Sequence, residues 1–134
     1  MEELRKKFIV EENLEAKKLA EYVERALPFC KISKNGEVII EVEKATSTEK
    51  VKLALVAKML ASHIESNISS ETNFDDLSKS LGIPRDQIKA RLKELKDKKF
   101  ALRVGEGKYK ANPLEIGKFL SEMEKKYGEK TGKP

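Results

Sequence analysis

The sequence has very little of the chemistry that builds metal sites and covalent cross-links. Its 134 residues include one cysteine, one histidine and no tryptophan. A lone Cys30 excludes an internal disulfide and a cysteine metal cluster, and it fits a reducing cytoplasm. His63 has no second histidine or cysteine with which to share a metal. We therefore expect no metal and no cofactor, a buried apolar role for Cys30, and a buried or boundary position for His63.

Long apolar runs are also missing. The longest, LALVAKMLA, is interrupted by Lys58 and is too short to cross a bilayer, and the acidic start MEELRKK lacks the layout of a secretory signal. The sequence contains no glycine-rich phosphate loop, no paired-carboxylate pattern and no activated nucleophile that could be assembled. These absences predict a cytoplasmic protein that has no membrane partner and is not an enzyme.

What the chain has in abundance is charge. Charged residues make up 38% of the sequence, and the formal net charge is +5. Lysine and glutamate dominate beside a single glutamine, which is typical of thermophilic proteins. The excess is local, because residues 79–110 contain eleven basic and four acidic side chains, a net of +7, while the rest of the chain nets −2. A basic block on one structural unit indicates a surface for a polyanion.

A helix, a tight turn and a second helix are predicted around this block. Residues 74–81 follow helical spacing, with Thr72 as the expected N-cap. Gly82 suits the left-handed conformation of a helix C-cap, and Pro84 fixes φ at the first position of the second helix. The second helix carries one inward-facing stripe, formed by Ile88, Leu92 and Leu95.

The sequence ALRVGEGKYKANP after Phe100 predicts a β-hairpin, in which Leu102 and Val104 alternate with polar residues and Gly105-Glu106-Gly107 form the turn. Together with LSKSLGIPRDQIKARLKELKDKKF, this hairpin resembles the winged helix-turn-helix superfamily over residues 48–112, most of all its small archaeal and prokaryotic DNA-binding members. The resemblance implies a mainly helical α+β fold and double-stranded DNA binding by a transcription regulator or chromatin-associated protein. Winged helices also dock proteins or bind RNA, so both alternatives stay open.

Helical geometry assigns candidate contacts with nucleic acid. The expected phosphate contacts come from the second helix and the hairpin: Arg85, Lys89, Lys93, Lys96, Arg103, Lys108 and Lys110. Gln87 and Arg91 are the candidates for base contact, since glutamine can pair with adenine and arginine with guanine. Asp86 and Asp97 point most directly outward, which predicts more contact with the backbone than with bases. The plainer alternatives are a solvated helix with ordinary charge pairs and a hairpin that only caps the core, with Tyr109 buried against the second helix.

The first third of the chain predicts a helix followed by a hairpin. The helix covers residues 13–27, and residues 8–10 either extend it or form a short strand. Its apolar stripe consists of Leu14, Ala16, Leu19, Ala20, Val23 and Leu27. Asn35-Gly36 predicts a two-residue hairpin turn. That turn places Val38, Ile40 and Val42 on one face and Ile32 and Ile39 on the other, so the hairpin must pack against helices.

Two further helices complete the predicted fold. Thr46 and Glu49 have capping-box spacing before an apolar helix over residues 51–64, which we expect to be the first helix of the winged unit. Asn112 and Pro113 precede a helix whose stripe is Ile116, Phe119, Leu120, Met123 and Tyr127. That stripe either packs on its own domain or pairs two copies in a two-fold homodimer.

We expect three parts in all. Residues 1–47 form an extension docked on the core, residues 48–127 form the winged unit with its C-terminal helix, and residues 128–134 form a disordered tail.

Overall fold

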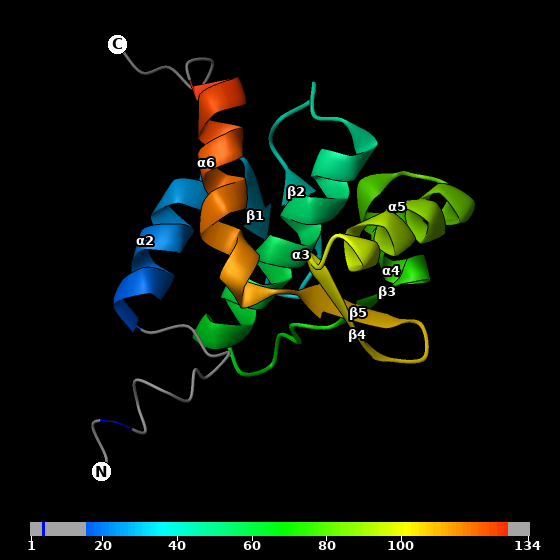
Figure 1. Cartoon of the computed structure of the whole chain (residues 1–134), viewed down its shortest axis with the longest axis horizontal. Coiled ribbons are helices and arrows are strands. Elements are labelled where there is room, and N and C mark those ends of the chain that lie inside the picture. Colours follow the sequence, from blue (N-terminus) through cyan, green and yellow to red (C-terminus); the bar gives the residue numbers. More distant parts are fainter. Residues whose placement is uncertain (1–3, 5–15, 129–134) are drawn as a thin grey trace.

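A computed structural model describes Leu4 and residues 16–128 of the chain (Figure 1). The expectations for residues 8–10, for Leu14 and for the tail beyond Gly128 lie outside the described residues. The described part is a mainly helical α+β fold with five α-helices and two small antiparallel sheets. Its elements are α2 (Ala16–Ala26), β1 (Cys30–Ile32), β2 (Val38–Ile40), α3 (Ser47–Ile64), β3 (Thr72–Asn73), α4 (Phe74–Leu81), α5 (Arg85–Asp97), β4 (Ala101–Gly105), β5 (Lys108–Ala111), the 3₁₀ turn η1 (Pro113–Glu115) and α6 (Ile116–Tyr127).

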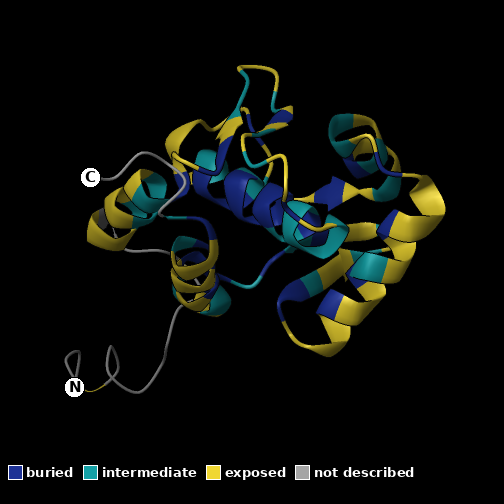
Figure 2. Ribbon diagram, turned by 90° about the horizontal axis from the view of Figure 1, so that it is seen from above, coloured by how far each residue is buried: buried dark blue, intermediate teal, exposed yellow. Residues whose placement is uncertain are grey.

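Helix α3 is the centre of the fold, and it contacts α2, both strands of the first hairpin, α4, α5 and β5. In Figure 2 it is the dark-blue, buried helix through the middle of the molecule. The predicted capping box is confirmed: the Thr46 N–H donates to Glu49 Oε1 (2.8 Å) and the Glu49 N–H donates to Thr46 Oγ1 (3.1 Å). The expectation for His63 was wrong. This residue is exposed, because it lies in the last turn of α3, beyond the packed part of the helix.

The first hairpin forms, but its turn is one residue longer than predicted. The Ser33 N–H donates to the Glu37 carbonyl (2.9 Å), so Lys34, Asn35 and Gly36 lie between the paired residues, with Gly36 at φ +85°. Ile32 therefore pairs with Val38 and shares its face. The prediction that Ile32 lies with Ile39 was wrong, since a one-residue change of register moves a side chain to the other face. Ile39 is 46% exposed.

The two consecutive helices α4 and α5 begin and end close to the predicted residues. Gly82 is the left-handed C-cap of α4 (φ +66°), and Pro84 is the N-cap immediately before α5. The prediction that Thr72 caps α4 was wrong: Asn73 is the cap and accepts from the Asp76 N–H (2.8 Å). Thr72 is buried, because it belongs to a short strand, β3, that the sequence did not reveal.

The second sheet has the strand order β3-β5-β4. Gly105 pairs with Lys108, so the turn contains only Glu106 and Gly107. The buried face of the hairpin consists of Ala101, Tyr109 and Ala111, whereas Leu102 and Val104 lie toward the outside. Two of these three core-facing residues are alanines, which suits the contact between β5 and α3.

Helices α2 and α6 lie side by side (Figure 1) and are joined by Arg25, whose Nη2 lies 2.9 Å from Glu124 Oε1 and 3.0 Å from Ser121 Oγ. This ion pair raises the pKa of Arg25. Ala20 and Leu27 were predicted to face inward on this helix, but both are exposed, and Leu27 lies one residue beyond the end of α2. The predicted stripe of α6 is buried within the chain itself: Ile116, Phe119, Leu120, Met123 and Tyr127. Packing on its own fold therefore accounts for that stripe, which leaves none of these five side chains for a second copy.

Cys30 is buried as expected, and desolvation raises the pKa of its thiol to about 12. Gly128 was predicted to begin the tail, but it continues the helical conformation of α6 (φ −56°, ψ −39°). In the described residues no helix has the length and apolar character needed to span a bilayer.

Candidate nucleic-acid interface

The half-buried Phe74, at the first position of α4, gathers parts of three elements around its ring. The ring of Tyr109 on β5 packs against it at a centroid distance of 5.7 Å and a tilt of 44°. A Cβ atom on Gly107 would lie 3.9 Å from Phe74 Cε2, so the turn of the β4–β5 hairpin is next to the same ring. Arg85 Cζ and Lys89 Nζ, both on α5, each lie 5.4 Å from the ring centroid. We call these four residues, Phe74, Tyr109, Arg85 and Lys89, the Phe74 cluster.

The Phe74 cluster fixes how the basic helix and the hairpin lie relative to each other. A cation over an aromatic face gains electrostatic attraction from the ring, about 0.5–1 kcal/mol at an exposed site. Arg85 and Lys89 are both exposed, so their charged groups also remain open to solvent. The cluster therefore brings two of the predicted phosphate contacts next to the hairpin turn.

Lys93 and Lys96 continue the same side of α5. With Arg85 and Lys89 they have spacings of four, four and three residues, which aligns them along one helix side. All four are exposed. We call this set, Arg85, Lys89, Lys93 and Lys96, the basic side of α5. Its four charges extend over about three turns of the helix, a length of roughly 17 Å.

Acidic groups border this basic side. Arg85 Nε donates to Asp75 Oδ1 at 2.7 Å, across from the first turn of α4. Asp86 and Asp97 are exposed on the outer strip of α5, as helical geometry predicted. A polyanion that reaches Arg85 must therefore displace or share the Asp75 carboxylate. This arrangement favours contact from the side of the helix over deep insertion of its outer strip.

The two candidates for base contact lie on the other flank of α5. Gln87 is exposed, whereas Arg91 is half-buried and its Nη2 lies 3.4 Å from Glu94 Oε1. Arg91 Nε is buried without a hydrogen-bond partner among the described residues. Because Glu94 holds the Arg91 guanidinium along the helix, this side chain would have to swing outward to meet a base edge.

The three cations of the hairpin are divided between its two faces. Arg103 pairs with Tyr109 in the strand register, so it shares the face that turns toward the core, but it is exposed near the tip. Lys108 and Lys110 alternate with Tyr109 and lie on the opposite face. One straight stretch of duplex cannot touch both faces at once. The structure thus brings Arg103 and the Phe74 cluster to one side and separates Lys108 and Lys110 from them.

Two residues of this surface were missed by the sequence analysis. Phe74 and Asp75 entered the prediction only as the first two residues of the helix over residues 74–81. The sequence held a partial signal: an aromatic residue followed by carboxylates at the start of the first helix. Because the turn after that helix folds the second helix back, residues at this start lie close to the second helix. The distance from Asp75 to Arg85, ten residues on, depends on the angle between α4 and α5, which the sequence pattern does not specify.

Comparisons with known proteins give no outside guide to this surface. Neither the protein-family models, nor the curated proteins, nor the solved structures contain a match to the chain. The assignment of function therefore depends on the geometry and charge described above.

Proposed function

We propose that residues 48–112 form a winged helix-turn-helix unit that binds double-stranded DNA, with the basic side of α5 and the β4–β5 hairpin contacting the phosphate backbone. The element order α3, β3, α4, α5, β4, β5 and the three-stranded sheet β3-β5-β4 support the winged assignment. Helix-turn-helix proteins place their second helix in the major groove. Here α5 is that helix.

The observation that carries the proposal is the Phe74 cluster. It holds Arg85 and Lys89 beside the hairpin turn, so that cations from the helix and from the hairpin's Arg103 face a common partner. Contacts from such a cluster would be mostly to phosphates, because Asp86 and Asp97 lie on the outer strip of the helix. We therefore propose a binder with modest sequence preference, suited to transcription regulation or to chromatin.

A binding titration tests this function directly. The wild type is compared with an Arg85→Ala/Lys89→Ala/Lys93→Ala/Lys96→Ala variant on duplex DNA, duplex RNA and single-stranded DNA at two salt concentrations. The expected result is a log–log salt slope of about −4 to −6 for five or six neutralised phosphates. The variant should lose at least about 100-fold in affinity for duplex DNA, and its slope should fall in magnitude by about 3 to 4.

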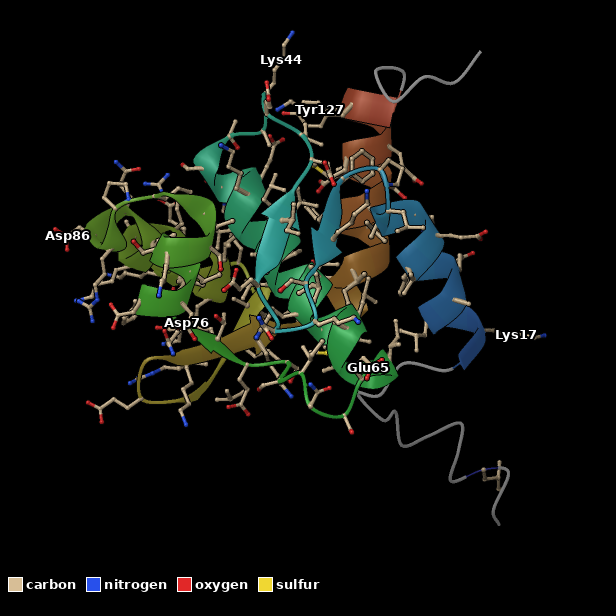
Figure 3. All side chains as sticks on the ribbon, turned by 180° about the vertical axis from the view of Figure 1, so that it is seen from behind. Lys17, Lys44, Glu65, Asp76, Asp86 and Tyr127 are labelled. Atoms are coloured by element: carbon tan, nitrogen blue, oxygen red, sulfur yellow. The ribbon has the colours of Figure 1, made fainter. Side chains whose placement is uncertain are left out.

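A matched control removes the same amount of charge elsewhere. Lys17, Lys34, Lys44 and Lys125 are exposed lysines outside α4, α5 and the second hairpin, and Lys17 and Lys44 lie well away from Asp86 of α5 in Figure 3. Their replacement by alanine should change affinity less than threefold. Equal losses in the two variants would mean that net charge, not the basic side of α5, drives binding.

Two other outcomes would replace the proposal. Absence of any duplex binding at about 50 mM salt would favour a protein-docking role for the winged unit. Tighter binding of duplex RNA than of duplex DNA in direct competition would favour an RNA-associated or ribosome-associated role.

A further inference from the structure

An open apolar groove lies in the N-terminal half, between α2, β1 and the C-terminal half of α3. Its volume is about 590 Å³. Val23 lines it from α2 and Leu27 from the turn that follows α2, Leu60 and Ile64 line it from α3, and residues 30–34 line it along β1 and the start of the hairpin turn. Glu65, labelled in Figure 3, marks the end of α3 at this groove. Leu27 and Ile64 are 49% and 58% exposed, so both walls present apolar surface to solvent.

The strand in this groove has an unpaired edge. The Glu41 N–H donates to the Phe29 carbonyl and the Ser33 N–H donates to the Glu37 carbonyl, each at 2.9 Å. In an antiparallel pair these bonds alternate along the strand, so the N–H and C=O groups of Cys30 and Ile32 point away from β2. Among the described residues, none of these four backbone groups has a hydrogen-bond partner.

We propose that this groove binds an extended peptide segment of a partner protein, which adds a strand to the free edge of β1. Only an extended backbone offers donors and acceptors at the two-residue repeat of Cys30 and Ile32, since the backbone groups of a helix are already paired. Every second side chain of the peptide enters the groove and meets apolar walls. The segment is therefore one in which apolar residues alternate.

Charge narrows the chemistry of the partner. Two lysines line the groove, Lys31 on β1 and Lys34 in the hairpin turn after it; Lys31 is paired with Glu41 (3.2 Å), whereas Lys34 is exposed and has no ion pair within the described part of the chain. An acidic residue beside the apolar positions of the peptide complements Lys34. Helix α2 and strand β1, which line the groove, lie on the other side of α3 from α5 in Figure 1. The peptide therefore leaves the basic side of α5 uncovered, and the inference does not depend on the proposed function.

Amide hydrogen exchange on the full chain, read by NMR, tests the proposal with a defined probe. The probe is the acetylated and amidated peptide EEVTVTVEE, and its control is the same peptide N-methylated on its five central residues, which keeps the side chains and removes the donors. We expect the probe to bind with a Kd in the micromolar range and to slow exchange of the Cys30 and Ile32 amides at least tenfold. The N-methylated control should do neither.

Two pairs of variants locate the site. Ile64→Asp, on the groove wall, should weaken binding of the probe at least tenfold. Leu114→Asp, at an exposed apolar residue of η1 outside the groove (69% exposed, against 58% for Ile64), should leave affinity unchanged. Lys34→Glu should weaken the probe about threefold, and flanking the peptide with lysine in place of glutamate should restore binding to that variant.

Three outcomes overturn the proposal. The first is unchanged exchange at 1 mM probe. The second is protection of the Cys30 and Ile32 amides in the free protein at every concentration, which would mean that the chain's own residues cover the edge. The third is protection that rises with protein concentration, which would identify a second copy of the chain as the occupant.

Discussion

The two hairpins of this protein start from similar sequence signals and end in different surroundings. The β1–β2 hairpin is a two-stranded sheet on α3, and one of its edges opens into an apolar groove. The β4–β5 hairpin has β3 paired to β5 at one edge and carries cations on both faces. Bare edges are usually protected by charge or by a covering element. In the second hairpin β3 covers the edge of β5, and the outer strand β4 carries the exposed Arg103. The first hairpin leaves its β1 edge without a partner in the described chain and open to an apolar groove.

The chain segments that follow the two hairpins also differ. After β2 the chain reaches Glu49, whose carboxylate accepts from the Tyr127 hydroxyl (2.6 Å) and from Lys126 Nζ (2.9 Å). After β5 it reaches Asn112, whose neutral amide donates to the Lys99 carbonyl (2.9 Å) and accepts from the Leu114 N–H (3.1 Å). The segment after the first hairpin is thus held to α6 by an ionised group, and the segment after the second hairpin is held by an uncharged one, which predicts different responses to pH.

The register of the first hairpin gives the largest expected effect. Val38→Asp and Ile32→Asp should each lower the free energy of unfolding by more than about 2 kcal/mol, because both side chains pack on the core face and a buried charge is costly. Ile39→Asp should change it by about 0.5 kcal/mol or less, since Ile39 is on the outer face. Urea unfolding measures all three. Equal decreases in the free energy of unfolding for Ile32→Asp and Ile39→Asp would support the two-residue turn that the sequence predicted.

Lowering the pH should destabilise the fold through Glu49, which follows the first hairpin. Burial would raise the pKa of Glu49, but the hydrogen bonds from Tyr127, the Thr46 N–H and Lys126 outweigh it and lower this pKa from 4.5 to about 2. A depressed folded-state pKa stabilises the fold above pH 4.5, and the stabilisation is lost as the pH falls toward 2. The expected loss is of the order of 1–2 kcal/mol.

Unfolding of wild type and Glu49→Gln at pH 7, 4 and 2.5 measures this contribution. The wild type should lose more stability than the variant over that range. Asn112→Ala is the control at the second exit, and its deficit should be the same at all three pH values. If Glu49→Gln lost as much stability as the wild type between pH 7 and pH 2.5, other carboxylates would account for the acid sensitivity.

Substitution of the turn glycines should have a smaller effect on the stability of the two hairpins. Gly36 and Gly107 have φ of +85° and +70°, so replacement of either by alanine should cost about 1 kcal/mol. Gly105 lies in β4 without a positive φ, and a Cβ there would meet only Lys108 at an ordinary 3.6 Å. Gly105→Ala should therefore change the midpoint of thermal unfolding by much less. A large loss at Gly105 would place it in the turn, as the sequence alone suggested.

Local signals in the sequence predicted the elements well. The capping box at Thr46, the C-cap at Gly82 and the inward stripe of α5 depend on residues within one or two turns of each other, and all three are confirmed. The loop of the first hairpin was wrong by one residue, because Asn-Gly also fits a three-residue loop with glycine in the left-handed position. Strand β3 was missed, since two residues carry no periodicity.

The candidate site was only partly predictable for a related reason. Helical geometry placed the basic side of α5 and its acidic outer strip from sequence alone. The Phe74 cluster, the Asp75–Arg85 pair and the division of the hairpin cations depend on angles between elements, and no residue pattern within one element encodes those angles. The groove along β1 is of the same kind, because α2, β1 and α3 create it only by packing together.

The smallest expected effect concerns Asp75, the acidic partner of Arg85 in the Phe74 cluster beside the second hairpin. Asp75→Asn should release Arg85 from its 2.7 Å contact and tighten duplex DNA binding about threefold, roughly 0.6 kcal/mol. Asp76→Asn is the matched control, because it removes the same charge one residue away. The Asp76 carboxylate accepts from Asn73 Nδ2 (3.2 Å). A gain confined to Asp75→Asn assigns the effect to Arg85 itself. An equal gain in both variants would instead assign it to the general field of the α4 N-terminus, and Arg85 would then be an ion-pair partner of α4 with no direct part in binding.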